Sequence, residues 1–122
     1  MRVRQDNRRR AAVRARPLAA LLLLVSLAAL AQTPSSTYPV PPELWDRPRT
    51  ARAVLEQDNV KHAVAAALQK PDTQIVIHHA AGQEPLLQAE ELRSWLAALA
   101  IDSRRVVLRS DVPTGMAIEI AP

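Results

Sequence analysis

Two short apolar segments on either side of a helical pattern set the strongest limit on how this chain can fold. Residues 75–77 read Ile-Val-Ile and residues 106–108 read Val-Val-Leu, and such β-branched runs are typical of buried strands. Between them, residues 86–100 carry leucines and a tryptophan at helical spacing. A strand, a helix and a second strand joined in this way predict two parallel strands with a right-handed crossover.

Two further segments complete the predicted fold. Apolar residues recur at helical spacing from Thr50 to Gln69, and Thr50 stands where an N-cap is expected. Residues 116–120 alternate and predict a last strand, which we expect to form a hairpin with the strand at 104–109. The predicted fold class is an α/β (α+β) two-layer sandwich. Two helices pack on one face of a small mixed sheet, and a C-terminal hairpin follows the crossover.

The start of the chain, residues 1–31, predicts a secretory signal peptide. An arginine-rich beginning is followed by the apolar run Leu18–Leu30 and by small residues before an expected cut between Ala31 and Gln32. Thirteen residues are too few to cross a bilayer, which takes roughly 20. The product should be periplasmic or secreted. The alternative is an uncleaved anchor that begins near Ala11.

The positive charge of the chain belongs to this leader. The formal net charge is +4, but from Gln32 onward nine Lys and Arg stand against eleven Asp and Glu, a net charge of −2. A basic nucleic-acid-binding surface is therefore not expected, nor is a membrane span after leader cleavage. The chain has no cysteine, which excludes disulfides, thiol chemistry and lipid attachment at a cysteine.

A proline-rich linker is predicted at 32–49, ahead of a small domain at 50–122. Proline removes backbone donors and restricts the residue before it, so no strand is expected there and the sheet should have three strands. Trp45 is the one bulky apolar side chain of this linker. We expect it to fold back onto the domain, and the alternative is an exposed anchor for a partner.

Two adjacent histidines, His78 and His79, stand at the end of the first predicted strand of the crossover. Imidazole is a common metal ligand and proton shuttle. Neighbours in a strand point to opposite faces, however, so the two rings cannot hold one ion, and His62 belongs to another element. We expect a hydrogen-bonded structural role and predict no metal site and no cofactor.

Patterns for catalysis are lacking. No serine stands in a sequence that resembles a nucleophile elbow. Glu90 and Glu91 diverge by about 100° on a helix, as adjacent residues do, and Gly82 is too isolated to form a phosphate-binding loop. The sequence predicts no catalytic residue and favours a protein that is not an enzyme.

Three arginines flank the second apolar strand. Arg105 and Arg109 are expected to share one face of that strand, whereas Arg104 points the other way. Such a pair could contact an anion or a glycan. The alternative is an ordinary polar sheet face.

Several motifs resemble the C-terminal OmpA-like domain, a peptidoglycan-binding module of the bacterial envelope, over roughly residues 50–120. The segment "IVIHHAA" stands where the family has a strand ending in a Gly-His-Thr-Asp type motif, with His79 at the histidine. The segment "QAEELRSWLAALAIDSRRVVL" has the spacing of the family's helix and the strand after it, and "MAIEI" is similar to its closing strand.

The resemblance implies where a ligand would bind. Members of the family bind the diaminopimelate of the peptide stem through the aspartate of that motif and an arginine of the helix. This sequence has Ala81 and Gln88 in their places, and the loop 82–87 is shorter than usual. A charged hydrogen bond contributes roughly 1.5 to 3 kcal/mol, so losing both groups should weaken binding at least about a hundredfold.

These observations predict an exported, envelope-associated binding module that contacts peptidoglycan weakly or binds an envelope protein. Its candidate ligand-binding residues are His78, His79, Gln88, Arg105 and Arg109. Two alternatives stay open. One is an accessory subunit that completes its sheet with a protein partner, because a missing first strand leaves an edge. The other is a metal protein that depends on its histidines.

Overall fold

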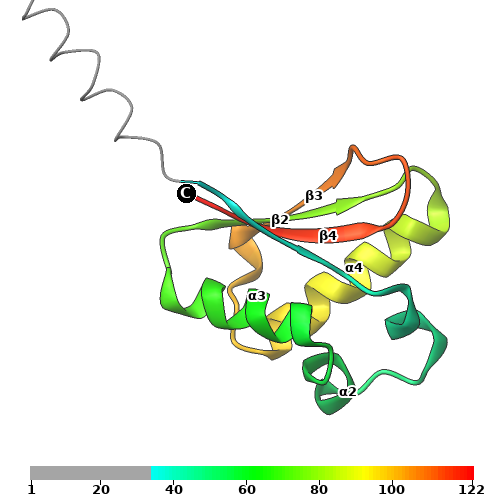
Figure 1. Ribbon diagram of the computed structural model, residues 1–122, viewed down its shortest axis with the longest axis horizontal. Coiled ribbons are helices and arrows are strands. Elements are labelled where there is room, and N and C mark those ends of the chain that lie inside the picture. Colours follow the sequence, from blue (N-terminus) through cyan, green and yellow to red (C-terminus); the bar gives the residue numbers. More distant parts are fainter. Residues whose placement is uncertain (1–33) are drawn as a thin grey trace, which may run out of the picture. The chain divides into compact units, whose positions relative to one another are not determined.

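The computed structural model describes residues 34–122 (Figure 1). The predicted signal peptide and its cleavage site lie outside the described residues. Within residues 34–122, no helix has the length and apolar character needed to cross a membrane. The elements in chain order are β1 (Ser36–Pro39), the 3-10 helix η2 (Pro42–Asp46), α2 (Ala51–Leu55), α3 (Asp58–Gln69), β2 (Gln74–His79), α4 (Gln83–Ala98), the 3-10 turn η3 (Ser103–Arg105), β3 (Val106–Ser110) and β4 (Met116–Ala121).

The predicted fold class is confirmed. Four strands form one mixed sheet in the order β1-β4-β2-β3, and the helices lie on one side of it (Figure 1). β2 and β3 are parallel, with Ile75 opposite Val106, and α4 connects them as the crossover helix. β4 runs antiparallel to both of its neighbours, β2 and β1.

The sheet has a strand where the sequence predicted only linker. β1 pairs with β4 along Ser36–Pro39, and the backbone N–H of Val40 extends the pairing to the Met116 carbonyl at 2.9 Å. Proline is tolerated here because an edge strand pairs on one side only. The three-stranded sheet was therefore a wrong prediction. The chain itself occupies the edge that the accessory-subunit alternative assigned to a partner.

The two C-terminal strands do not form the predicted hairpin. β4 lies between β1 and β2, so β2 separates it from β3. The connection at 111–115 carries the chain past the end of β2. This position gives β4 a hydrogen-bonded neighbour on each side and buries Met116, Ile118 and Ile120 on the helix-covered face. The hairpin was predicted because the two strands are close in sequence. Closeness in sequence does not indicate that the last strand pairs between β1 and β2.

The first predicted helix, at 50–69, is two helices. Thr50 is the N-cap of α2 as predicted, and its Oγ1 accepts a hydrogen bond from the Ala53 N–H at 3.1 Å. The chain then turns at Gln57, whose extended backbone interrupts the helix before α3 begins. Three helices thus cover the sheet instead of the two predicted.

The core lies between the helices and the sheet and contains no phenylalanine. Ile75, Ile77 and Ile118 of the sheet are almost completely buried, as are Leu92 and Leu96 of α4. The predicted return of Trp45 onto the domain also occurs, since its indole packs against this cluster. β2 is a central strand, and the polar contacts and cavities described below lie near its two ends.

Candidate functional site

The adjacent histidines at the end of β2 lie on opposite faces of the sheet, as the alternation predicts. His79 points into the helix-covered layer, where it is 4% exposed, and its Nδ1 lies 2.8 Å from the Ala80 carbonyl oxygen. This contact satisfies one ring nitrogen within the chain. His79 is thus placed as a structural side chain.

His78 lies on the sheet face that the helices leave uncovered. Its Nδ1 is 2.7 Å from Oδ1 of Asp111, and its Nε2 is 3.8 Å from Oε1 of Glu119. Arg109 stands opposite His78 in the register of β2 and β3. Within the described part of the chain, no group of three or more His, Asp or Glu side chains could hold a metal ion. The cluster is a polar patch that joins β2, β4 and the loop after β3.

Arg105 has a different position from the one the sequence predicted. It lies in η3, and its guanidinium donates to the carbonyl oxygens of Thr73 at 3.0 Å, Ala67 at 3.0 Å and Lys70 at 2.8 Å. These acceptors belong to the last turn of α3 and to the segment that leads into β2. Arg105 therefore holds the end of a helix, and the predicted strand face shared with Arg109 does not form.

The neighbouring Arg104 is almost fully exposed. It forms an ion pair with Asp102, with Nη2 and Oδ2 2.8 Å apart. The hydrogen bonds from the side chain and the backbone N–H of Arg104 lower the pKa of the Asp102 carboxyl from its ordinary 3.8 to about 2. Neither Arg104 nor Asp102 lines either of the two cavities described below.

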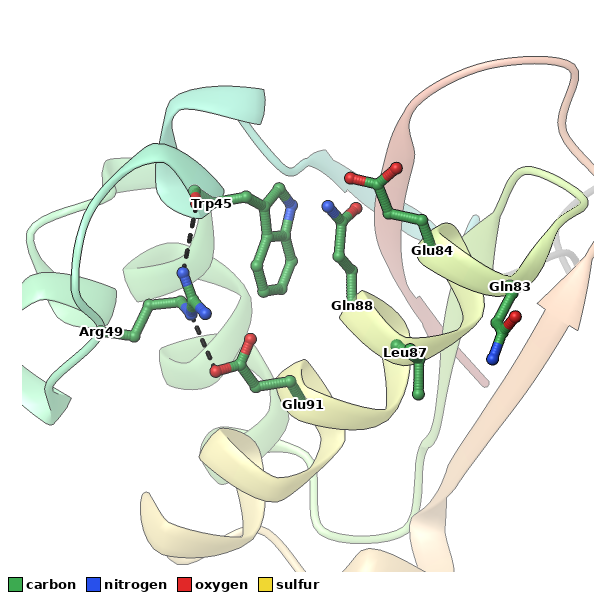
Figure 2. Close-up of a pocket in the computed structure, with 7 residues that line it drawn as sticks. All are labelled: Trp45, Arg49, Gln83, Glu84, Leu87, Gln88 and Glu91. Carbon is green, nitrogen blue, oxygen red and sulfur yellow. Dashed lines mark hydrogen bonds and ion pairs between the residues drawn. The ribbon is translucent and has the colours of Figure 1, made fainter.

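Gln88 is the predicted residue that the fold brings to a groove. The groove lies between η2 and α4 and has a volume of about 480 Å³ (Figure 2). It is lined by Trp45, Arg49, Gln83, Glu84, Leu87, Gln88 and Glu91. Its α4 residues come from the N-terminal half of the helix, the half that follows the end of β2.

Arg49 fixes one wall of the groove. Its Nε donates to Oε1 of Glu91 at 2.8 Å, and its Nη1 donates to the carbonyl oxygens of Trp45 at 3.2 Å and Arg47 at 3.0 Å. The guanidinium carbon also lies 5.5 Å from the centroid of the indole ring. In Figure 2 the indole stands between Arg49 and Gln88. No local sequence pattern indicates this contact, because Arg49 and Glu91 are 42 positions apart.

A second, smaller cavity of about 150 Å³ adjoins the end of β2. Trp45 and Gln88 line both cavities, and Ala80, Pro85 and Met116 contribute to the smaller one. Ala80 precedes Ala81, the position at which the resemblance expects a ligand-binding aspartate. The smaller cavity thus adjoins the predicted position without including Ala81 in its lining, and Trp45 forms a wall that the motif gave no reason to expect.

Comparisons of this chain with models of protein families, with curated proteins and with solved structures found no match. The resemblance to the OmpA-like domain therefore stays a prediction from motifs. The fold class rests on the sheet and its helices, and the candidate site rests on the side chains that line the groove.

Proposed function

We propose that this chain is an exported binding module of the cell envelope and that the groove between η2 and α4 is its ligand site. The observation that carries the proposal is the position of the groove beside the C-terminal end of β2, where open α/β sheets commonly bind ligands. Its volume is within the range of about 300 to 1,000 Å³ that is usual for ligand sites.

The side chains of the groove favour binding over catalysis. They supply an indole, two amides, an aliphatic side chain, the carboxylate of Glu84 and a guanidinium that is already paired with the carboxylate of Glu91. The lining contains no hydroxyl, thiol or imidazole, so the groups in it that could act as nucleophiles are these two carboxylates. Held by several hydrogen bonds, Arg49 and Trp45 form a wall that needs little ordering when a ligand binds.

Two sequence features support an envelope location and a cell-wall or envelope-protein ligand. The leader at 1–31 has the parts of a secretory signal. The motifs around β2 and α4 resemble the OmpA-like domain, with Ala81 and Gln88 at the positions of its two ligand-binding residues. Gln88 lines both cavities, so the residue that the resemblance selects is also one that a ligand would contact.

Restoring the two charged groups tests the proposal. The double variant Ala81→Asp/Gln88→Arg is expected to sediment with purified peptidoglycan sacculi at least about tenfold more tightly than the unchanged chain, because it regains charged hydrogen bonds. A matched control is Ala65→Asp/Gln69→Arg, which makes the same replacements at exposed positions of α3. Equal retention of the two double variants would contradict a cell-wall site at this end of β2.

A further inference from the structure

Among the described residues, one carboxylate of the groove forms no ion pair. Arg49 and Glu91 form an ion pair at 2.8 Å, so their charges cancel locally. Within residues 34–122, Glu84 takes part in no ion pair. In Figure 2 its carboxylate stands near the amide of Gln88 on the α4 wall. Within the described residues, the groove therefore presents one carboxylate that no cationic side chain pairs with, although the positive end of α4 lies close to it.

The surfaces next to that carboxylate are apolar. Leu87 lines the groove and is 60% exposed. It is among the large apolar side chains that the described part of the chain leaves in water. The indole of Trp45 supplies a further apolar wall between Arg49 and Gln88 (Figure 2). A ligand suited to this lining has an aliphatic stem that ends in a positive charge.

We infer that the groove binds a lysine side chain of a partner protein, with the ammonium at Glu84 and the stem along Leu87 and Trp45. The inference rests on the proposed function, because it specifies the ligand of the same groove. A lysine stem covers apolar surface while its charged end stays hydrated, which fits an open groove. Leu87 is 60% exposed and leaves apolar surface for the residues that flank the lysine in a partner protein, which a small free amine cannot cover.

A peptide titration followed by NMR tests the charge and the stem separately. The probe is acetyl-Ala-Lys-Ala-amide, and its matched control is acetyl-Ala-norleucine-Ala-amide, which keeps an aliphatic stem without the charge. The chain has two tryptophans, so Trp45 reports on the groove and Trp95 serves as an internal reference. At low salt the lysine peptide should shift the indole N–H signal of Trp45, with the norleucine peptide binding about threefold to fivefold more weakly.

Matched variants on α4 locate the charge. Glu84→Gln should weaken binding of the lysine peptide about threefold to fivefold, whereas Glu90→Gln, an exposed position outside the groove lining, should leave it unchanged. Equal binding of the two peptides, or wild-type binding by Glu84→Gln, would overturn the inference. Tighter binding of a peptidoglycan stem peptide at Trp45 would also overturn it, by assigning the groove to the cell wall. The sacculus experiment leaves Glu84 unchanged, so the two proposals can fail separately.

Discussion

The two ends of β2 use polar side chains in opposite ways. Where β2 begins, Nε and Nη2 of Arg105 donate to the carbonyl oxygens of Thr73, Ala67 and Lys70, so these donors are bonded inside the chain. Where β2 ends, Gln88 and Glu84 line an open groove instead. Both ends lie beside a helix terminus. Each has a residue that the sequence predicted to bind a ligand, Arg105 at the first end and Gln88 at the second. The polar groups at the second end, unlike Arg105, line a cavity that a ligand could enter.

The difference follows from which helix terminus meets the strand. The last turn of α3 presents carbonyl groups with no partner in the helix, and these attract a guanidinium. At the other end, α4 begins after Gly82 (φ 117°), which provides no side-chain cap. Glu84 in the first turn offsets the positive end of the helix while it keeps its carboxylate at the surface. The roles of Arg105 and Glu84 thus depend on which helix terminus each side chain lies beside, and not on their charge alone.

The largest effect is expected from removing the arginine at the beginning of β2. Arg105→Ala should lower the free energy of unfolding by about 2 kcal/mol, because several carbonyl acceptors lose a charged donor at a partly buried site. Urea denaturation would measure the change. Arg109→Ala is the matched control at an exposed position of β3 and should change stability by less than about 0.5 kcal/mol. Equal losses in the two variants would remove the distinction between them.

Much of the sheet could be predicted from local patterns. The parallel pairing of β2 with β3 follows from two apolar runs and the helix between them, and the opposite directions of His78 and His79 follow from strand alternation. β1 escaped prediction because its short sequence carries proline and because its hydrogen bonds go to β4, at the far end of the chain. Local patterns contain no information about such a distant partner.

The sequence indicated one residue of the candidate site and missed the rest of its lining. Of the five predicted ligand-binding residues, Gln88 lines the groove, whereas His78, His79, Arg105 and Arg109 do not. The Arg49 clamp on Glu91 and the contact of Asp111 with His78 join residues that are 42 and 33 positions apart. Arg105 was assigned to a strand face because its 3-10 turn and its acceptors in and after α3 depend on packing between elements.

A smaller effect is expected at the groove end of β2. Gln88→Ala should leave the free energy of unfolding within about 0.5 kcal/mol of the unchanged chain, because alanine favours a helix and no hydrogen bond of the Gln88 side chain is found within residues 34–122. The same urea series that includes Arg105→Ala would test this. A decrease in the free energy of unfolding as large as that of Arg105→Ala would mean that Gln88 stabilises the fold and is not primarily a ligand-binding residue.

The smallest effect is expected at η3, where Arg104 stands beside Arg105 but faces solvent. Arg104→Gln removes the largest cause of the low Asp102 pKa, so the pKa should rise from about 2 toward 3.8, though not fully, because the backbone N–H of residue 104 still donates. A carboxyl whose pKa is lowered in the fold favours folding above its ordinary pKa, and the effect disappears as the pH falls through about 2. Since both side chains are exposed, stability at neutral pH should not change measurably.

An NMR titration of the Asp102 carboxyl carbon would follow the change in its pKa, with Arg109→Gln as control. An unchanged Asp102 pKa in Arg104→Gln would show that the ion pair does not persist in solution.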